Sequence, residues 1–156
     1  MDFSSITNAI LRAVETWEPE LNQLPRELIT GRRNRQNRSI KQILGHLIDS
    51  AANNHQRMAR LQYNKVLVFP DYQQDNDLWI ALQNYQNADW QTIIQLWKMY
   101  NLHIIQVIQS VDITALDNCW HNFEGTAVSL RQMIEGYPEH LTLHMNEIRE
   151  LINAKS

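Results

Sequence analysis

The chain has 156 residues, a formal net charge of −3 and 44% hydrophobic residues. This size fits one domain with its own core, and the charge balance excludes a disordered chain and a protein that binds nucleic acid through bulk positive charge. The sequence has no apolar run near the ~20 residues of a membrane span, no visible secretory leader and a single cysteine, Cys119, so we expect one cytoplasmic domain over residues 1–156 without an internal disulfide.

The first predicted element is a helix over residues 4–17. Apolar residues recur there at helical spacing, and only four glycines and four prolines interrupt the whole chain, which favours helices over many strands. Pro19 and Pro25 are expected to break this helix. The loop at residues 31–38 holds four arginines that could contact a phosphate or an acidic partner, although a solvated loop is the favoured interpretation. These arginines are Arg32, Arg33, Arg35 and Arg38.

A second helix is predicted from Ser39 to about Tyr63. Ser39-Ile40-Lys41-Gln42 is a capping box, in which the Ser39 hydroxyl accepts from the Gln42 amide and the Gln42 side chain reaches back. At ~100° per residue, a polar stripe borders the apolar face of this helix, and His55 points roughly opposite to it. The stripe consists of His46, Ser50, Asn53 and Arg57.

The middle of the chain predicts a crossover and two further helices. Residues 65–76, with Pro70, are expected to cross over, and they precede a short helix over residues 78–85 and a long one over residues 89–110. Asn101 is expected on the inward face of the long helix.

The last helix is predicted to begin at a second capping box, Ser129-Leu130-Arg131-Gln132, and to run to about Asn153. Pro138 lies inside it and predicts a kink or restart just before His140. Four amphipathic helices, with a longer crossover between the second and the third, predict an all-α four-helix bundle.

Two histidines in the last helix, His140 and His144, are the most informative pair in the chain. Side chains at i and i+4 lie one turn apart on the same helix face, where two imidazoles can hold one divalent metal ion. A third ligand must come from another helix, and His46 is the best candidate because it flanks a core-facing stripe. His103 is expected on the outer side of its helix, and His121 lies in a loop. Histidines that are hydrogen-bonded in the core are the alternative that spacing alone leaves open.

The residues around these histidines resemble the DinB/YfiT-like superfamily. Gly45-His46-Leu47-Ile48-Asp49-Ser50, followed by Asn53 and Arg57, is similar to its second-helix motif, and residues 130–137 leading into His140 and His144 are similar to its last-helix motif. Asp75, Trp79 and residues 96–101 resemble its middle portion. The resemblance covers about residues 36–152.

The resemblance implies a four-helix bundle that holds one divalent metal ion, zinc or nickel, on His46, His140 and His144. It also implies an enzyme of a bacterial type that joins a low-molecular-weight thiol, such as bacillithiol, to an electrophilic small molecule. The metal would bind and deprotonate the thiol. A metal-dependent hydrolase and a stress-related metal-binding or scaffold protein without turnover are the alternatives.

Other polar residues of the motif are candidates for supporting roles. Asp49, Ser50 and Asn53 are expected around the ligands, where Asp49 or Asn53 could orient His46 through its other ring nitrogen. Arg57 could hold a substrate carboxylate or phosphate, and Glu147 could accept a hydrogen bond or carry a proton. A polar bundle network or a surface salt bridge is the alternative for each.

The resemblance further suggests a homodimer. Trp79, Trp90 and Trp97 fall close together, and large aromatic residues are enriched at interfaces, although Trp79, Trp97 and Tyr137 also fit the core. No nucleic-acid or membrane partner is expected. Cys119 is interpreted as structural or incidental.

Overall fold

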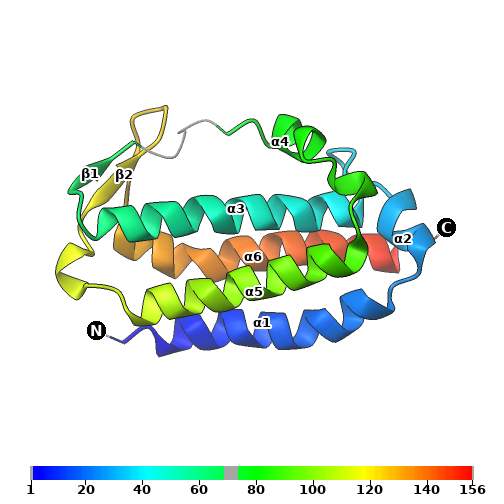
Figure 1. Cartoon of the computed structure of the whole chain (residues 1–156), viewed down its shortest axis with the longest axis horizontal. Helices are drawn as coiled ribbons and strands as arrows, with labels where there is room; N and C mark the ends of the chain where they lie inside the picture. The colour runs from blue at the N-terminus through cyan, green and yellow to red at the C-terminus, as the bar shows by residue number, and fades with distance from the viewer. Residues whose placement is uncertain (1, 69–73, 156) are drawn as a thin grey trace.

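A computed structural model describes residues 2–68 and 74–155, and four long helices run side by side in it (Figure 1). They are α1 (Ser4–Gln23), α3 (Ile40–Leu61), α5 (Trp90–Gln109) and α6 (Leu130–Asn153). Both α1 and α3 pack against α5 and α6. In Figure 1, α3 and α5 run in one direction, and α1 and α6 run in the opposite direction. Because α3 and α5 are parallel, the chain has to pass back along the length of the bundle between the end of α3 and the start of α5. The predicted all-α four-helix bundle with a longer second crossover is confirmed.

The sequence explains where the two site-bearing helices begin. The Ser39 hydroxyl accepts a hydrogen bond from the backbone of Gln42, whose side chain accepts from the Ser39 amide in return. Ser129 and Gln132 repeat this arrangement at the start of α6. Each capping box satisfies two helix-end donors that would otherwise lack partners. Both predicted capping boxes are confirmed.

The core lies between the apolar faces of the four long helices. Trp97, Ile94 and Leu44 are fully buried there, and burial of one large apolar side chain contributes about 1.5–3 kcal/mol. Asn101 is also fully buried, as its inward position predicted. Its amide donates to the Trp97 carbonyl at 2.8 Å, and its oxygen accepts from the Tyr137 hydroxyl at 2.9 Å. The buried amide is therefore satisfied at both ends.

Two prolines, Pro19 and Pro138, lie inside helices where the sequence predicted an interruption. Helix α1 continues through Pro19 to Gln23, so the helix end expected there is wrong. Helix α6 is continuous through Pro138, so a restart before His140 is wrong, whereas a kink at Pro138 stays a prediction. An interior proline costs about 3 kcal/mol in an isolated helix. Buried neighbours such as Leu21 and Leu141 hold these turns against the core, and tertiary packing therefore outweighs the lost hydrogen bond. Pro25 does separate two helices.

The connections contain more structure than the sequence predicted. Short helices α2 (Arg26–Gly31) and α4 (Asn76–Leu82) and the 3-10 turns η1 (Tyr85–Asn87) and η2 (Ile113–Ala115) join the long helices. The short helix predicted over residues 78–85 is therefore divided between α4 and η1. Pro70, expected in the crossover, lies outside the described residues. No helix in residues 2–68 and 74–155 is long and apolar enough to cross a membrane.

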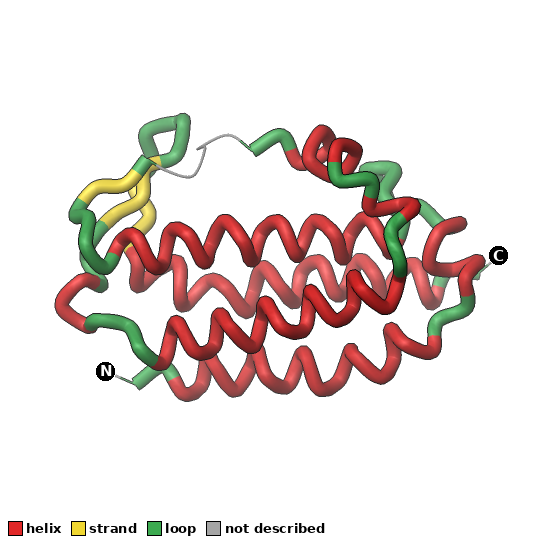
Figure 2. The backbone as a smooth tube through the Cα atoms, in the orientation of Figure 1, coloured by secondary structure: helices red, strands yellow, loops and turns green. Residues whose placement is uncertain are grey.

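A small sheet at one end of the bundle was not predicted (Figure 2). Its strands are β1 (Val66–Leu67), β2 (Cys119–His121) and β3 (Ala127–Ser129), in the order β1-β2-β3. β1 pairs with β2 in parallel, with Val66 opposite Cys119, and β2 pairs with β3 in an antiparallel hairpin. Strands of two or three residues are too short to show the alternation that identifies a strand in sequence.

The arginine-rich loop is not simply solvated. Arg38 is only 6% exposed, and its guanidinium donates to Asp77 of α4 at 2.9 Å. Arg32 donates to the Leu151 carbonyl at 2.6 Å, near the C-terminus of α6, where unpaired carbonyls accept cationic donors. Both arginines are structural, so the interpretation as a solvated loop is wrong for them.

Candidate metal centre

Three histidines from two neighbouring helices converge in the bundle. His46 comes from α3, and His140 and His144 come one turn apart from α6, which packs against α3. One ring nitrogen from each lies within 4.8 Å of the others. The Nε2 atoms of His140 and His144 are 3.2 Å apart, and the His46 ring centroid is 4.6 Å from that of His144. The three residues predicted to form one site therefore lie together.

Glu147 orients one of these rings. Its Oε2 atom lies 3.0 Å from Nδ1 of His144, three residues earlier on the same helix. A carboxylate accepts only, so Nδ1 carries the proton and donates, which leaves the lone pair of Nε2 directed at His140. A carboxylate on the second ring nitrogen is a recurrent arrangement for histidines that bind metal, because it fixes the tautomer and raises the basicity of the ligand.

Burial keeps two of the three imidazoles neutral. It lowers the pKa of His46 to about 3, with smaller contributions from the neighbouring His144 and Arg38. It also lowers the pKa of His140 to about 4, and the proximity of His144 adds to this effect. Neutral rings keep a lone pair available, which is the form that binds a metal ion.

The geometry of the three rings fits a divalent metal ion. Bonds of ~2.0–2.1 Å at a tetrahedral angle place two nitrogen ligands about 3.3 Å apart, close to the 3.2 Å between His140 and His144. Nδ1 of His46 is buried and has no hydrogen-bond partner among the described residues. A histidine that only stabilised the core would have one. Imidazole nitrogens are ligands for both zinc and nickel.

The residues expected around the ligands have different partners. Asp49 accepts from Tyr85 at 2.7 Å and from Gln83 at 2.8 Å, and burial raises its pKa. Asn53 donates to Gln74. Within the described part of the chain no hydrogen bond joins Asp49 or Asn53 to His46, so the prediction that one of them orients His46 is wrong.

Ser50 is the one of these three that reaches a ligand. Its hydroxyl lies 3.5 Å from Nδ1 of His140, at the outer limit of a hydrogen bond. Asp49 instead contacts η1 and the end of α4, and Asn53 contacts the segment that precedes α4.

Two clefts meet beside the histidines. The polar cleft has a volume of about 300 Å³, and the apolar cleft has a volume of about 280 Å³. Ser50, Arg57 and His140 line both. The polar cleft is completed by His46, Asn53, Gln74, Asn76 and Phe123. The apolar cleft is completed by Asn54, Trp120, Val128, Gln132, Met133, Gly136 and Tyr137.

A family comparison agrees with this arrangement. The model of the DinB superfamily matches residues 9–148. The chain belongs to the DinB superfamily.

A solved structure shows the same fold. YfiT from Bacillus subtilis matches this DinB-superfamily chain with a TM-score of 0.78 and 15% sequence identity, over 97% of this chain and 88% of that one. YfiT is described as a probable metal-dependent hydrolase with an unusual four-helix bundle topology. No functionally curated protein matches this chain in sequence.

Several residues near the site of this DinB-superfamily member were missed by sequence reasoning. Trp120 lines the apolar cleft from β2, where its ring contacts Arg57, and the polar cleft is lined by Gln74, just before α4, and by Asn76, the first residue of α4. All three come from segments far from His46 in sequence, and no local pattern marks them.

The tryptophans predicted to lie in the core differ in burial. Trp97 is buried, whereas Trp79 is 36% exposed.

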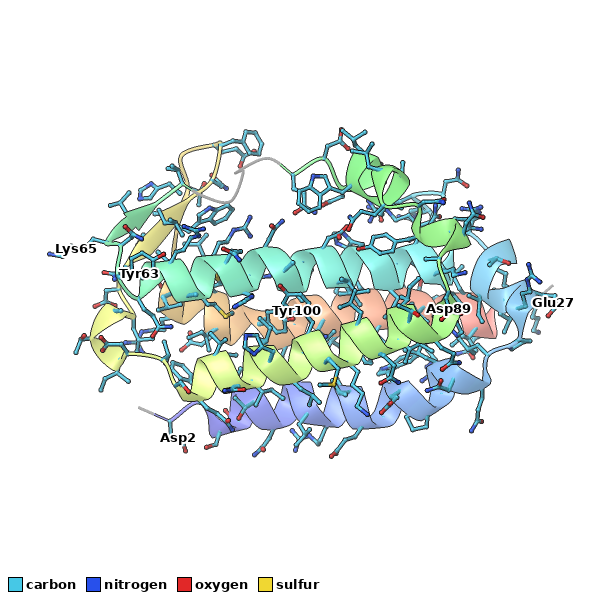
Figure 3. All side chains as sticks on the ribbon, in the orientation of Figure 1. Asp2, Glu27, Tyr63, Lys65, Asp89 and Tyr100 are labelled. Carbon is cyan, nitrogen blue, oxygen red and sulfur yellow. The ribbon has the colours of Figure 1, made fainter. Side chains whose placement is uncertain are left out.

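A second pair of histidines lies on another face of the bundle. His55 lies 3.3 Å from the hydroxyl of Tyr100, which is halfway along α5 (Figure 3), and its ring centroid is 4.7 Å from that of His103. His103 is exposed, as predicted. No third histidine, cysteine or carboxylate from the described residues joins this pair, so it lacks the ligand set found at His46.

Proposed function

We propose that this protein is a divalent-metal-dependent enzyme that transfers a low-molecular-weight thiol to an electrophilic small molecule. The observation that carries the proposal is the convergence of three imidazole nitrogens within 4.8 Å beside two clefts that meet at His140. Zinc or nickel is the proposed ion. With three protein ligands, a zinc-like site keeps one position open for a reactant.

The histidines and Glu147 prepare the site. When bound, the ion would supply Lewis acidity that lowers the pKa of a thiol or a water molecule. The Glu147 carboxylate holds His144 in the tautomer whose Nε2 lone pair faces the centre. Burial keeps His46 and His140 neutral through their lowered pKa values. These groups position the reactants and are not consumed.

The lining of the clefts favours a thiol over water. No acidic residue among the described lining residues of either cleft is available as a general base. A thiol, with a pKa near 8.5, needs less assistance to ionise at neutral pH than water does. Two clefts that share His140 also suit a reaction of two substrates.

A metal-dependent hydrolase is the second candidate. The description of YfiT as a probable metal-dependent hydrolase supports it, and Glu147 supplies a carboxylate next to His144. Hydrolysis of an ester or amide without added thiol would favour this reaction over transfer.

The test combines metal content with turnover. Protein purified without a histidine tag is analysed for metal, then assayed for conjugation of glutathione, cysteine and bacillithiol to monochlorobimane. We expect about one ion per chain and thiol conjugation that chelation abolishes, with both lost in His46→Ala and His144→Ala. His103→Ala is the matched control, because His103 is exposed and lines neither cleft. Equal metal in wild type and His144→Ala would refute the site, and bound metal without turnover of thiols or esters would favour a scaffold.

The homodimer remains a prediction of the family resemblance. Two of the three tryptophans that were expected at a dimer interface have partners within the chain. Trp97 is fully buried, and Trp90 donates to the Leu21 carbonyl at 2.9 Å. Light scattering on a sizing column measures the mass directly.

A further inference from the structure

Arg57 is a partly buried cation without an anion beside it. Its guanidinium lies 3.9 Å from the centroid of the Trp120 ring. Its Nε is buried and has no hydrogen-bond partner among the described residues, and no salt bridge within them includes Arg57. Buried charges in proteins are normally paired.

Another buried arginine of this chain shows the usual solution. Arg38 donates to Oδ1 of Asp77 twice, from Nη2 at 2.9 Å and from Nε at 3.1 Å. Arg57 has the same chemistry but faces an aromatic ring and two open clefts. Burial lowers its pKa to about 10, which leaves it fully charged at neutral pH. Among the described residues only the Trp120 ring offsets its desolvation, and no anion does.

The position of Arg57 connects it with the proposed reaction centre. It stands eleven residues after His46 on α3, roughly 16 Å of helix rise, and side chains on a helix point back toward its N-terminus. Its long side chain therefore extends toward the histidines, and it lines both clefts together with His140. A molecule in either cleft can reach the guanidinium and the centre at once.

The local charge is opposite to that of the whole protein. The chain carries a net charge of −3, yet neither cleft has an acidic residue among its described lining residues, and Arg57 is the one formal charge there. Like Arg57, a divalent ion on the neutral histidines would be positive. An anionic reactant is therefore favoured on electrostatic grounds.

We propose that Arg57 binds the carboxylate of an apolar small molecule that occupies the apolar cleft and reacts at the three-histidine centre. Trp120, Met133 and Tyr137 provide the apolar walls. A single planar guanidinium, 3.9 Å from the centroid of the Trp120 ring, matches the two oxygens of a planar carboxylate. The reaction part of this proposal rests on the proposed function, whereas the carboxylate binding does not.

The test measures binding without metal, because a carboxylate can also ligate an ion. Calorimetric titrations on the chelated protein compare acetate, phenylacetate and 4-phenylbutanoate with the neutral amide of each. We expect the phenyl-bearing acids to bind more tightly than acetate and about 10- to 100-fold more tightly than their amides, as a charge-assisted hydrogen bond requires. Phenylphosphonate distinguishes the class of anion, and tighter binding of it than of phenylacetate would overturn the carboxylate assignment.

Variants locate the binding. Arg57→Gln should lose the preference for acid over amide, and Arg57→Lys should recover only part of it, because lysine keeps the charge but not the planar fork. Arg12→Gln removes the same charge from an exposed position outside both clefts and should bind like wild type. Gly136→Leu fills the apolar cleft where an added Cβ meets no atom within 4 Å, and it should weaken 4-phenylbutanoate more than acetate.

The outcomes separate this proposal from the proposed function. An acid preference that survives Arg57→Gln, or no carboxylate-dependent binding by any of the three acids, overturns the role of Arg57 even if the protein holds zinc. Carboxylate binding that depends on Arg57 in a protein that binds no metal supports this proposal and refutes the metal centre. Circular dichroism of each variant confirms that loss of binding is not loss of fold.

Discussion

Gly45, the residue before His46, tests how tightly η1 packs against α3. A Cβ added at Gly45 would lie 2.8 Å from Cδ1 of Tyr85 and nearer still to Cγ and Cδ2, whereas ordinary carbon contacts are about 3.5–4.0 Å. Tyr85 is only 6% exposed, and its hydroxyl donates to the buried Asp49 at 2.7 Å. The ring cannot yield by about 1 Å without disturbing that hydrogen bond.

We therefore expect Gly45→Ala to lower the free energy of unfolding by about 2–6 kcal/mol. Overpacking contributes about 1–3 kcal/mol, and loss of the hydrogen bond to Asp49 contributes about 1–3 kcal/mol more. Gly136→Ala is the matched control, since it is also inside a helix but meets no atom within 4 Å. It should raise stability by up to ~1 kcal/mol through helix propensity.

Urea denaturation of the chelated protein, followed by circular dichroism, measures both effects. Tyr85→Leu removes the obstructing ring, and the double variant Gly45→Ala/Tyr85→Leu should show a smaller cost of the alanine than the wild-type background does. A cycle of this kind isolates the contact between the two positions. If Gly45→Ala is as stable as wild type, or if its cost is unchanged without the ring, the reasoning from this packing is wrong.

The remaining predictions concern the metal centre. Glu147→Gln should weaken zinc binding by about 10- to 100-fold, because a neutral amide orients His144 less strongly; competition with a chromophoric chelator measures this, and unchanged affinity would remove Glu147 from the site. The chelated protein should lose stability as pH falls from 8 to 5, by about 2 kcal/mol for each of His46 and His140. Their folded pKa values of about 3 and 4 lie below the unfolded value of ~6.5, so the unfolded chain binds more protons. His46→Gln/His140→Gln should flatten that dependence in urea titrations. Pro138→Ala should keep the helix by circular dichroism yet weaken zinc binding by changing the orientation of His140; equal affinity would make Pro138 a packing residue.

Local patterns predicted the helices that carry the site. The capping boxes at Ser39 and Ser129 mark the first turns of α3 and α6, because their partners lie three residues away in sequence. The spacing of His140 and His144 likewise fixes their common face. Periodicity made His46 the best candidate for the third ligand, and the family resemblance then supplied the full ligand set, since spacing within one helix does not say which residue of another helix lies opposite.

Contacts between distant segments could not be predicted. Trp120 reaches Arg57 only because β2 pairs with β1 just beyond the end of α3, and a pairing of two residues leaves no trace in the sequence. Asp49 carries a motif position, yet its partner is Tyr85 of η1. The break expected at Pro19 failed for the same reason, because packing against other helices decides the local cost.

The unpaired polar atoms of the core are concentrated where ligands are proposed to bind. Among the described residues, the buried side-chain atoms without partners belong to His46, Asp49, Arg57, Trp97 and Trp120. His46 and Arg57 line the polar cleft and Trp120 lines the apolar one. Each such atom costs about 1–3 kcal/mol, and native cores retain few of them. A ligand that binds these residues only in the folded state should stabilise the fold by an amount set by its affinity and its free concentration.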